Sequence, residues 1–267
     1  MTRVFLHMLY GFRYSVSLVS LGMFLVSMLI IYIVEGMGGL EGVNDFMDMM
    51  PDGIKAMLKL DEGLGSVTGF IAAEYRDPGY FMISLGFAIA IASGFVAREI
   101  EDGTILMFGA MPIKRWRYLL GKIAALVIGM LVVVSAAGLG TYTGSLLTNT
   151  TSGIDFVAVS LVLINLLLLT LAVSGITAAL SATLSSGGRT VAISASIMGV
   201  MYFIDLLSSL LDSISDFAVL SLFHYYDTVA IANSGQLNSG HILLLLGITV
   251  TTFGLAIYIY NNRDITV

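Results

Sequence analysis

Residues 154–184 read IDFVAVSLVLINLLLLTLAVSGITAALSATL, and Asp155 is the only charged residue in this stretch. A helix needs about 20 mostly apolar residues to cross the hydrocarbon core of a bilayer, and this run is longer. A buried helix of a soluble protein would not need so long an uncharged run. The stretch therefore predicts a membrane-spanning helix that tilts strongly or projects beyond the bilayer.

Further apolar runs of sufficient length occur on both sides of this one, at residues 15–34, 80–97, 119–147, 191–211 and 241–260. The whole chain has the same character: 57% of its 267 residues are hydrophobic and 11% are charged, against roughly 25% charged residues in soluble domains. No low-complexity linker divides the chain. We therefore expect an all-α membrane protein with six transmembrane helices in a single domain, residues 1–267.

Several classes of protein are disfavoured by composition and motifs. The chain has no cysteine, which rules out disulfides, thiolate metal sites and a cysteine nucleophile. The net charge of −6 does not suit nucleic acid. The three histidines lie far apart in the sequence and form no HExxH motif, so we expect no metal site.

The chain also lacks the motif that binds ATP in P-loop proteins. That motif requires a glycine five residues before Gly-Lys and a Ser or Thr after it. Here Gly121-Lys122 is followed by Ile123, and Trp116 occupies the position of the first glycine. We therefore expect no cofactor on this chain, no catalytic residue and no enzymatic activity.

The distribution of basic residues predicts the orientation. With six crossings, both termini lie on one side, and nine of the twelve Lys and Arg residues fall on that side. Cytoplasmic loops carry this basic excess. We expect a multi-pass protein of the cell (plasma) membrane with both termini in the cytoplasm. The sequence Glu35-Gly36-Met37 is no small-residue cleavage site, so we expect the first helix to be retained.

Three segments outside the spans carry their own patterns. Residues 1–14 place Val4, Met8 and Phe12 on one helical stripe, which predicts a short amphipathic helix in the membrane interface, an elbow helix; a simple extension of the first span is the alternative. Residues 35–79 are expected to form a long outer loop that includes an amphipathic helix. Residues 212–240 are too interrupted to span, and predict an outer re-entrant or interfacial pair of short helices with Tyr225 and Tyr226 at headgroup level.

The spans themselves hold few polar groups. Asp205 is the one acidic candidate near the centre of a span, about two turns from its outer end. Asn165 is expected to hydrogen-bond to a neighbouring helix. Because a transporter coupled to an ion gradient often has an ionisable residue at the midplane, the energy for any transport is expected to come from outside the chain.

The most informative segment is the cytoplasmic loop at residues 98–118. Acidic residues end one helix, Gly103 stops or turns it, and Thr104 can cap a short apolar helix at 105–111 that Pro112 ends. This helix would present Leu106, Met107 and Phe108 to the groove of a partner. An ordinary loop with positive-inside charges explains the same residues about as well on physical grounds alone.

This segment resembles the signature of ABC-2 type permeases, the transmembrane subunits of ATP-binding-cassette transporters. The matching positions are Glu99, Glu101, Gly103-Thr104, Pro112, Arg115 and Gly121-Lys122. The end of the chain is similar too, with LSLFHYYD at 220–227 and Asn262-Arg263-Asp264-Ile265 after the last span. Relatives often have proline at the position of Leu222 and Arg-Arg-Asp at 262–264, so the match is imperfect.

The resemblance implies a permease, of the exporting kind, that pairs with a second permease copy and with separate ATPase subunits carrying ATP and Mg. Residues 105–111 would be the coupling helix that docks in a groove of the ATPase. The residues implied in this coupling are Glu99, Glu101, Asp102, Gly103, Thr104, Leu106, Met107, Phe108, Pro112 and Arg115. The alternatives are an autonomous secondary transporter and a membrane scaffold subunit without transport activity. The substrate cannot be read from the sequence.

Overall fold

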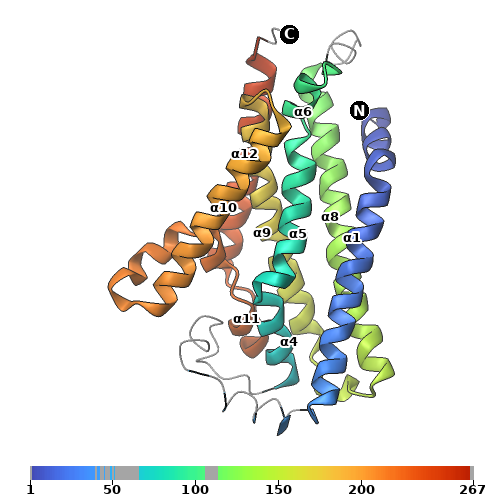
Figure 1. Ribbon diagram of the computed structural model, residues 1–267, viewed down its shortest axis with the longest axis vertical. Helices are drawn as coiled ribbons and strands as arrows, with labels where there is room; N and C mark the ends of the chain where they lie inside the picture. The colour runs from blue at the N-terminus through green and yellow to red at the C-terminus, as the bar shows by residue number, and fades with distance from the viewer. Residues whose placement is uncertain are drawn as a thin grey trace.

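The computed structural model describes residues 2–39, 66–105 and 114–264, together with residues 41, 42, 45, 49 and 51. Every regular element in these residues is a helix. The longest helices lie side by side in a bundle, and the two ends of the described chain lie toward the same end of it (Figure 1). We call this the terminal end, and the other the distal end.

Five helices are long and apolar enough to cross a membrane. They correspond to five of the six predicted spans, and their bounds are α1 (Thr2–Gly36), α8 (Arg115–Leu147), α9 (Phe156–Thr183), α10 (Gly187–Leu210) and α12 (Ser239–Asn262). The quoted run at 154–184 is α9 almost residue for residue, with Asp155 capping the amides of Val157 and Ala158. The prediction of an all-α protein with long apolar helices is confirmed for this part of the chain.

The predicted span at 80–97 is interrupted. It begins as α5 (Pro78–Ser93), breaks at residues 94–96, and resumes as the short α6 (Ala97–Glu101). Helix α4 (Val67–Arg76) precedes it, and Pro78 begins the new helix while Asp77 caps the amide of Gly79 at 2.8 Å. At about 1.5 Å per residue, α5 alone is about 24 Å long, shorter than a bilayer core of about 30 Å. A sixth span is therefore not confirmed by length.

Residues 1–14 do not form a separate interfacial helix within the part described. Residues 2–14 continue α1 without a break. The apolar stripe predicted there meets α8 at Phe12, which is buried and whose ring lies against Gly129. The elbow helix is therefore not confirmed, and the continuous helix agrees with the alternative weighed from the sequence, an extension of the first span.

The outer segments agree only in part with expectation. The amphipathic helix expected within 35–79 falls mostly outside the described residues. Residues 212–240 form the short helices η2 (Asp212–Leu220), η3 (Leu222–Tyr225) and α11 (Thr228–Ser234), but their re-entry into the membrane is not confirmed. Tyr226 is not at the surface. It is 1% exposed, and its hydroxyl donates to the carbonyl of Tyr75 at 2.9 Å.

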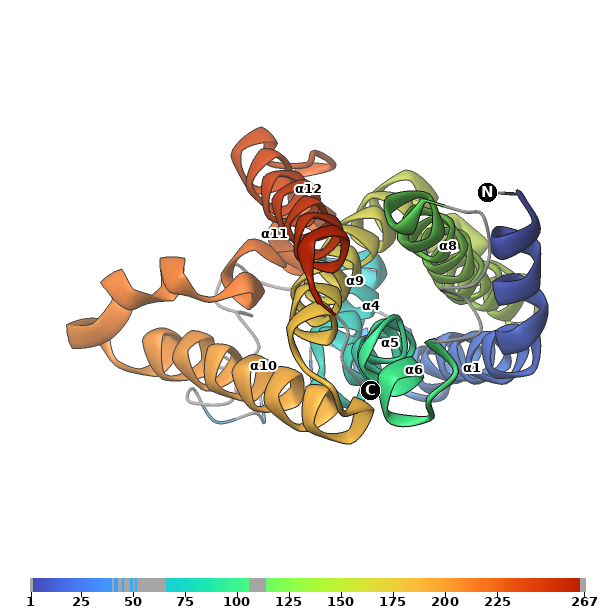
Figure 2. The same ribbon diagram turned by 90° about the horizontal axis from the view of Figure 1, so that it is seen from above.

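Packing in the bundle is built on close helix pairs. Helix α1 lies along α8, α12 lies along α9, and α5 packs on α9. Viewed from above, α10 reaches outward on the side away from α1 and α8 (Figure 2). Gly140 and Gly144 of α8 face α1, where a methyl group on Gly140 would collide with the main chain of Phe24. These small residues allow α1 and α8 of the same chain to approach closely.

Candidate functional site

A buried ion pair joins the two sides of the 98–118 loop at the terminal end. The Lys122 ammonium lies 2.5 Å from Glu99 Oε1, and the two side chains are 1% and 15% exposed. Lys122 also donates to the carbonyl of Phe95 at 2.5 Å, and the Tyr118 hydroxyl donates to Glu99 Oε1 at 2.7 Å. Glu99, expected to contact a partner, therefore points into the protein and holds α6 against α8.

Glu101 binds the start of another helix. Its Oε2 accepts from the amide of Gly187 at 2.8 Å, and its Oε1 accepts from the Ser186 hydroxyl at 3.0 Å. Exposed amides at a helix N-terminus favour an anion. The Gly187 amide, and then the Ser186 hydroxyl, hold the pKa of Glu101 below its usual range. Glu101 thus links α6 to the first turn of α10.

Ser181 holds the break between α5 and α6. Its hydroxyl accepts from the amides of Val96 and Ala97 at 3.1 and 3.0 Å, and donates to the carbonyl of Ser93 at 2.8 Å. These groups are left over where one helix ends and the next begins, and Ser181 is fully buried on α9. The kink is therefore satisfied by a neighbouring helix.

Two arginines bind the end of the last helix, α12, to neighbouring segments. Arg115 donates to the carbonyl of Arg263 at 2.7 Å. Arg263 in turn donates to the carbonyls of Ala182 and Leu184 at 2.8 and 2.9 Å, and to Ser185 Oγ at 2.7 Å. We call the residues that make these bonds the terminal frame: Glu99, Glu101, Arg115, Tyr118, Lys122, Ser181 and Arg263.

The rest of the predicted coupling residues are placed as follows. Gly103 has φ +68°, as expected of a glycine that stops a helix. The Thr104 hydroxyl donates to the carbonyl of Glu99 at 3.3 Å, and Asp102 is exposed. The predicted knob and the proline after it, Leu106, Met107, Phe108 and Pro112, lie outside the described residues.

Sequence reasoning missed the inward roles of Lys122, Ser181 and Arg263. Lys122 had one usable signal, since a single Lys inside an apolar run must find an anion or a carbonyl. Ser181 had none, because serine is common in membrane helices. Among the described residues, no group of three or more His, Asp or Glu could hold a metal ion.

The distal end has its own buried ion pair. Arg76, the last residue of α4, lies 2.7 Å from Asp205 Oδ2 on α10, and both side chains are 6% exposed. Arg76 also donates to the carbonyl of Tyr226 beside η3. Asp205, singled out from the sequence, is therefore neutralised by a neighbour. Asn165 donates to the carbonyl of Tyr225 at 3.3 Å, a bond to another element as predicted.

Comparison with known proteins agrees with the signature of the 98–118 loop. A search of curated proteins found no match to this chain. A family model described as ABC-2 family transporter protein matches residues 15–265, which includes every residue of the terminal frame. With its five long apolar helices, the chain is a multi-pass membrane protein and belongs to the ABC-2 family of transporter proteins.

Proposed function

We propose that this chain is the permease subunit of an ATP-binding-cassette exporter in the cell membrane. Separate ATPase subunits bind ATP and Mg, and this chain hydrolyses nothing itself. The observation that carries the proposal is the ion pair of Glu99 and Lys122. It joins the residues on either side of the predicted coupling helix, 105–111, so that this helix would start and end at a fixed point of the bundle, its base.

The terminal frame supports transmission of a force from that base. Glu99 ties the base to α8, Glu101 ties it to α10, and Arg115 ties it to the end of α12. Packed elements with discrete hydrogen-bonded contacts move as rigid bodies. A partner that pulls on residues 105–114 would therefore act on three long helices together.

The proposed topology has six crossings and cytoplasmic termini. Helices α4 and α5 follow one another along the bundle (Figure 1). With Asp77 between them they run from Val67 to Ser93, about 40 Å at about 1.5 Å per residue, which is enough for the sixth crossing. The terminal end then faces the cytoplasm, where the ATPase subunits bind, and a second permease copy completes the transporter.

The first experiment tests the ATPase partner. The affinity-tagged chain is purified from its own cells in mild detergent, and ATP hydrolysis is measured in the eluate. Leu106→Asp and Phe108→Asp each place a charge on the predicted apolar knob, and we expect them to remove the hydrolysis. The folding of each variant is checked by its thermal unfolding.

Gly188→Asp is the matched control. Gly188 is exposed in the first turn of α10 at the same end of the bundle, where a new Cβ would meet only Ser186 Oγ, at 4.0 Å, and the helix N-terminus favours a negative charge. We expect this variant to keep the ATPase. Equal hydrolysis in all three variants, or none with the unmutated chain, would contradict the proposal.

The second experiment tests direction. Inside-out vesicles that hold the purified complex expose the ATPase sites to added ATP. Export predicts that candidate cargo accumulates in these vesicles only with ATP and Mg. Accumulation driven by an ion gradient without ATP would instead identify a secondary transporter.

A further inference from the structure

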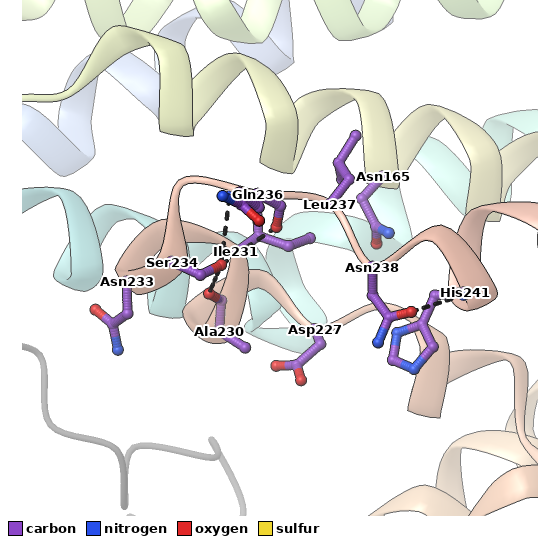
Figure 3. Close-up of a pocket in the computed structure, with 10 residues that line it drawn as sticks. All are labelled: Asn165, Asp227, Ala230, Ile231, Asn233, Ser234, Gln236, Leu237, Asn238 and His241. Atoms are coloured by element: carbon purple, nitrogen blue, oxygen red, sulfur yellow. Dashed lines mark hydrogen bonds between the residues drawn. The ribbon is translucent and has the colours of Figure 1, made fainter.

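A pocket of about 530 Å³ with mixed polar and apolar walls opens at the distal end, far from the terminal frame. It lies between α9, α11 and the turn that leads into α12 (Figure 3). Pockets of about 300–1,000 Å³ accommodate small molecules. Its lining includes Asn165, Asp227, Asn238 and His241.

One buried polar group of the lining, on Asn165, is an acceptor without a donor. Asn165 is 1% exposed. Its Nδ2 donates to the carbonyl of Tyr225, whereas its Oδ1 is buried and has no hydrogen-bond partner among the described residues. Native proteins rarely leave such an atom unpaired, because its lost hydration is not replaced. Oδ1 therefore calls for a donor from a molecule in the pocket.

The pocket also carries a free negative charge. Asp227 stands at the start of α11, but its carboxylate caps no amide there. In the described part of the chain, no ion pair engages it and no side-chain hydrogen bond satisfies it. The amide oxygen of Asn238 is different, since it already accepts from the amides of Gly240 and His241.

The lining has no Lys or Arg. Two unpaired acceptors, one of them anionic, in a lining without Lys or Arg and with His241 as its one imidazole, favour a ligand with a positive charge and several N–H donors. A primary ammonium group has three donors and one charge. A quaternary ammonium group has the charge without any donor, and a phosphate or carboxylate has the wrong sign.

We propose that this distal pocket binds a primary ammonium group, carried either by a soluble amine or by the headgroup of a lipid. The ammonium pairs with the Asp227 carboxylate, and Asn165 Oδ1 is the second unpaired acceptor of the same pocket. The assignment stands on the pocket alone and does not depend on the ATPase partner.

The test uses the full chain in phosphatidylcholine nanodiscs and measures binding of hexylammonium by calorimetry. Hexyltrimethylammonium and hexanol have the same chain, without donors and without charge respectively. We expect saturable binding of hexylammonium, and binding at least about tenfold weaker for the other two, since both the charge and the donors contribute. Equal binding of the three probes overturns the proposal without any mutation.

Variants locate the site. Asp227→Asn keeps the shape and removes the charge, and we expect at least about a tenfold loss of hexylammonium affinity. Asn165→Leu removes the buried acceptor and should lower the preference for hexylammonium over hexyltrimethylammonium. Asp216→Asn is the matched control, because Asp216 is an exposed residue of η2 outside the pocket. Unchanged affinity in Asp227→Asn, with unchanged thermal unfolding, overturns the assignment.

A further experiment with a different lipid composition distinguishes the two sources of the ammonium group. Replacing part of the phosphatidylcholine by phosphatidylethanolamine adds primary ammonium headgroups. A lower apparent affinity for hexylammonium, by competition, identifies the lipid as the ligand. An unchanged affinity identifies a soluble amine.

Discussion

Lys122 and Glu99 meet at 2.5 Å in the interior of the terminal end, although 22 residues separate them along the chain. The pair lies on either side of the segment that we propose to dock on an ATPase. A charge pair this deeply buried is costly to desolvate, and loss of one partner leaves the other uncompensated. Its presence therefore makes the base of the loop sensitive to single substitutions.

Lys122→Met should destabilise the chain more than a double variant that also removes the acid. The single variant leaves Glu99 buried without its cation, which costs about 3–5 kcal/mol of unfolding free energy. Glu99→Leu with Lys122→Met replaces the pair by apolar groups and should recover most of that loss. Unfolding in mixed micelles measures both, and Glu99→Leu alone completes the cycle. Strict additivity of the two single changes would show that the side chains do not interact.

The second ion pair predicts an effect at the distal end. Asp205→Asn leaves the Arg76 guanidinium buried with the carbonyl of Tyr226. We expect a loss of about 3–5 kcal/mol and faster hydrogen exchange in residues 222–226, because Arg76 holds this segment in place.

Asp216→Asn removes the same charge from an exposed position on η2 and should leave both measurements unchanged. Faster exchange at the terminal end only, with residues 222–226 unaffected, would contradict the role given to Arg76.

Glu101 predicts a pH dependence. Its pKa in the folded chain is lowered by the amide of Gly187 and the hydroxyl of Ser186. A lowered pKa contributes stability that is present above the unfolded value, about 4.3, and is lost as the pH falls through the folded value. The melting temperature should therefore fall as the pH drops below about 4.3, and Glu101→Gln should remove that part of the fall.

Asp102→Asn is the adjacent control, since Asp102 is exposed and makes no contact with the start of α10 among the bonds of the described residues. It should leave the acid branch of the profile as it is. Identical profiles for Glu101→Gln and the unmutated chain would refute the bond to α10 as a source of stability.

The contact of α1 with α8 predicts a steric effect. Gly140→Ala would bring a methyl group against the main chain of Phe24, and overpacking of this kind costs about 1–3 kcal/mol. Gly199→Ala on α10 adds the same methyl group where nothing lies within 4 Å. Thermal unfolding should separate the two variants, and equal melting temperatures would mean that α1 moves away at no cost.

The position of the terminal site along the chain could be predicted from the sequence, but the contacts between its side chains could not. The acidic residues, Gly103 and Gly121-Lys122 marked the loop, and the turn at Gly103 is where the pattern placed it. The direction of the side chains was not predictable. Glu99 was expected to face a partner, yet it lies on Lys122, because pairing across a loop depends on how two helices pack.

The sequence alone determined the membrane class, the five long helices and the family resemblance. The length of an apolar run is a local property, and it decides whether a segment can cross a bilayer. Tertiary structure decided the rest. In the folded chain residues 2–14 belong to α1, and Phe12 is buried against α8. Tertiary structure also paired Lys122 with Glu99 and left Asn165 Oδ1 open in a distal pocket. These outcomes depend on which groups meet across helices, and a polar group buried from water takes whatever partner packing brings to it.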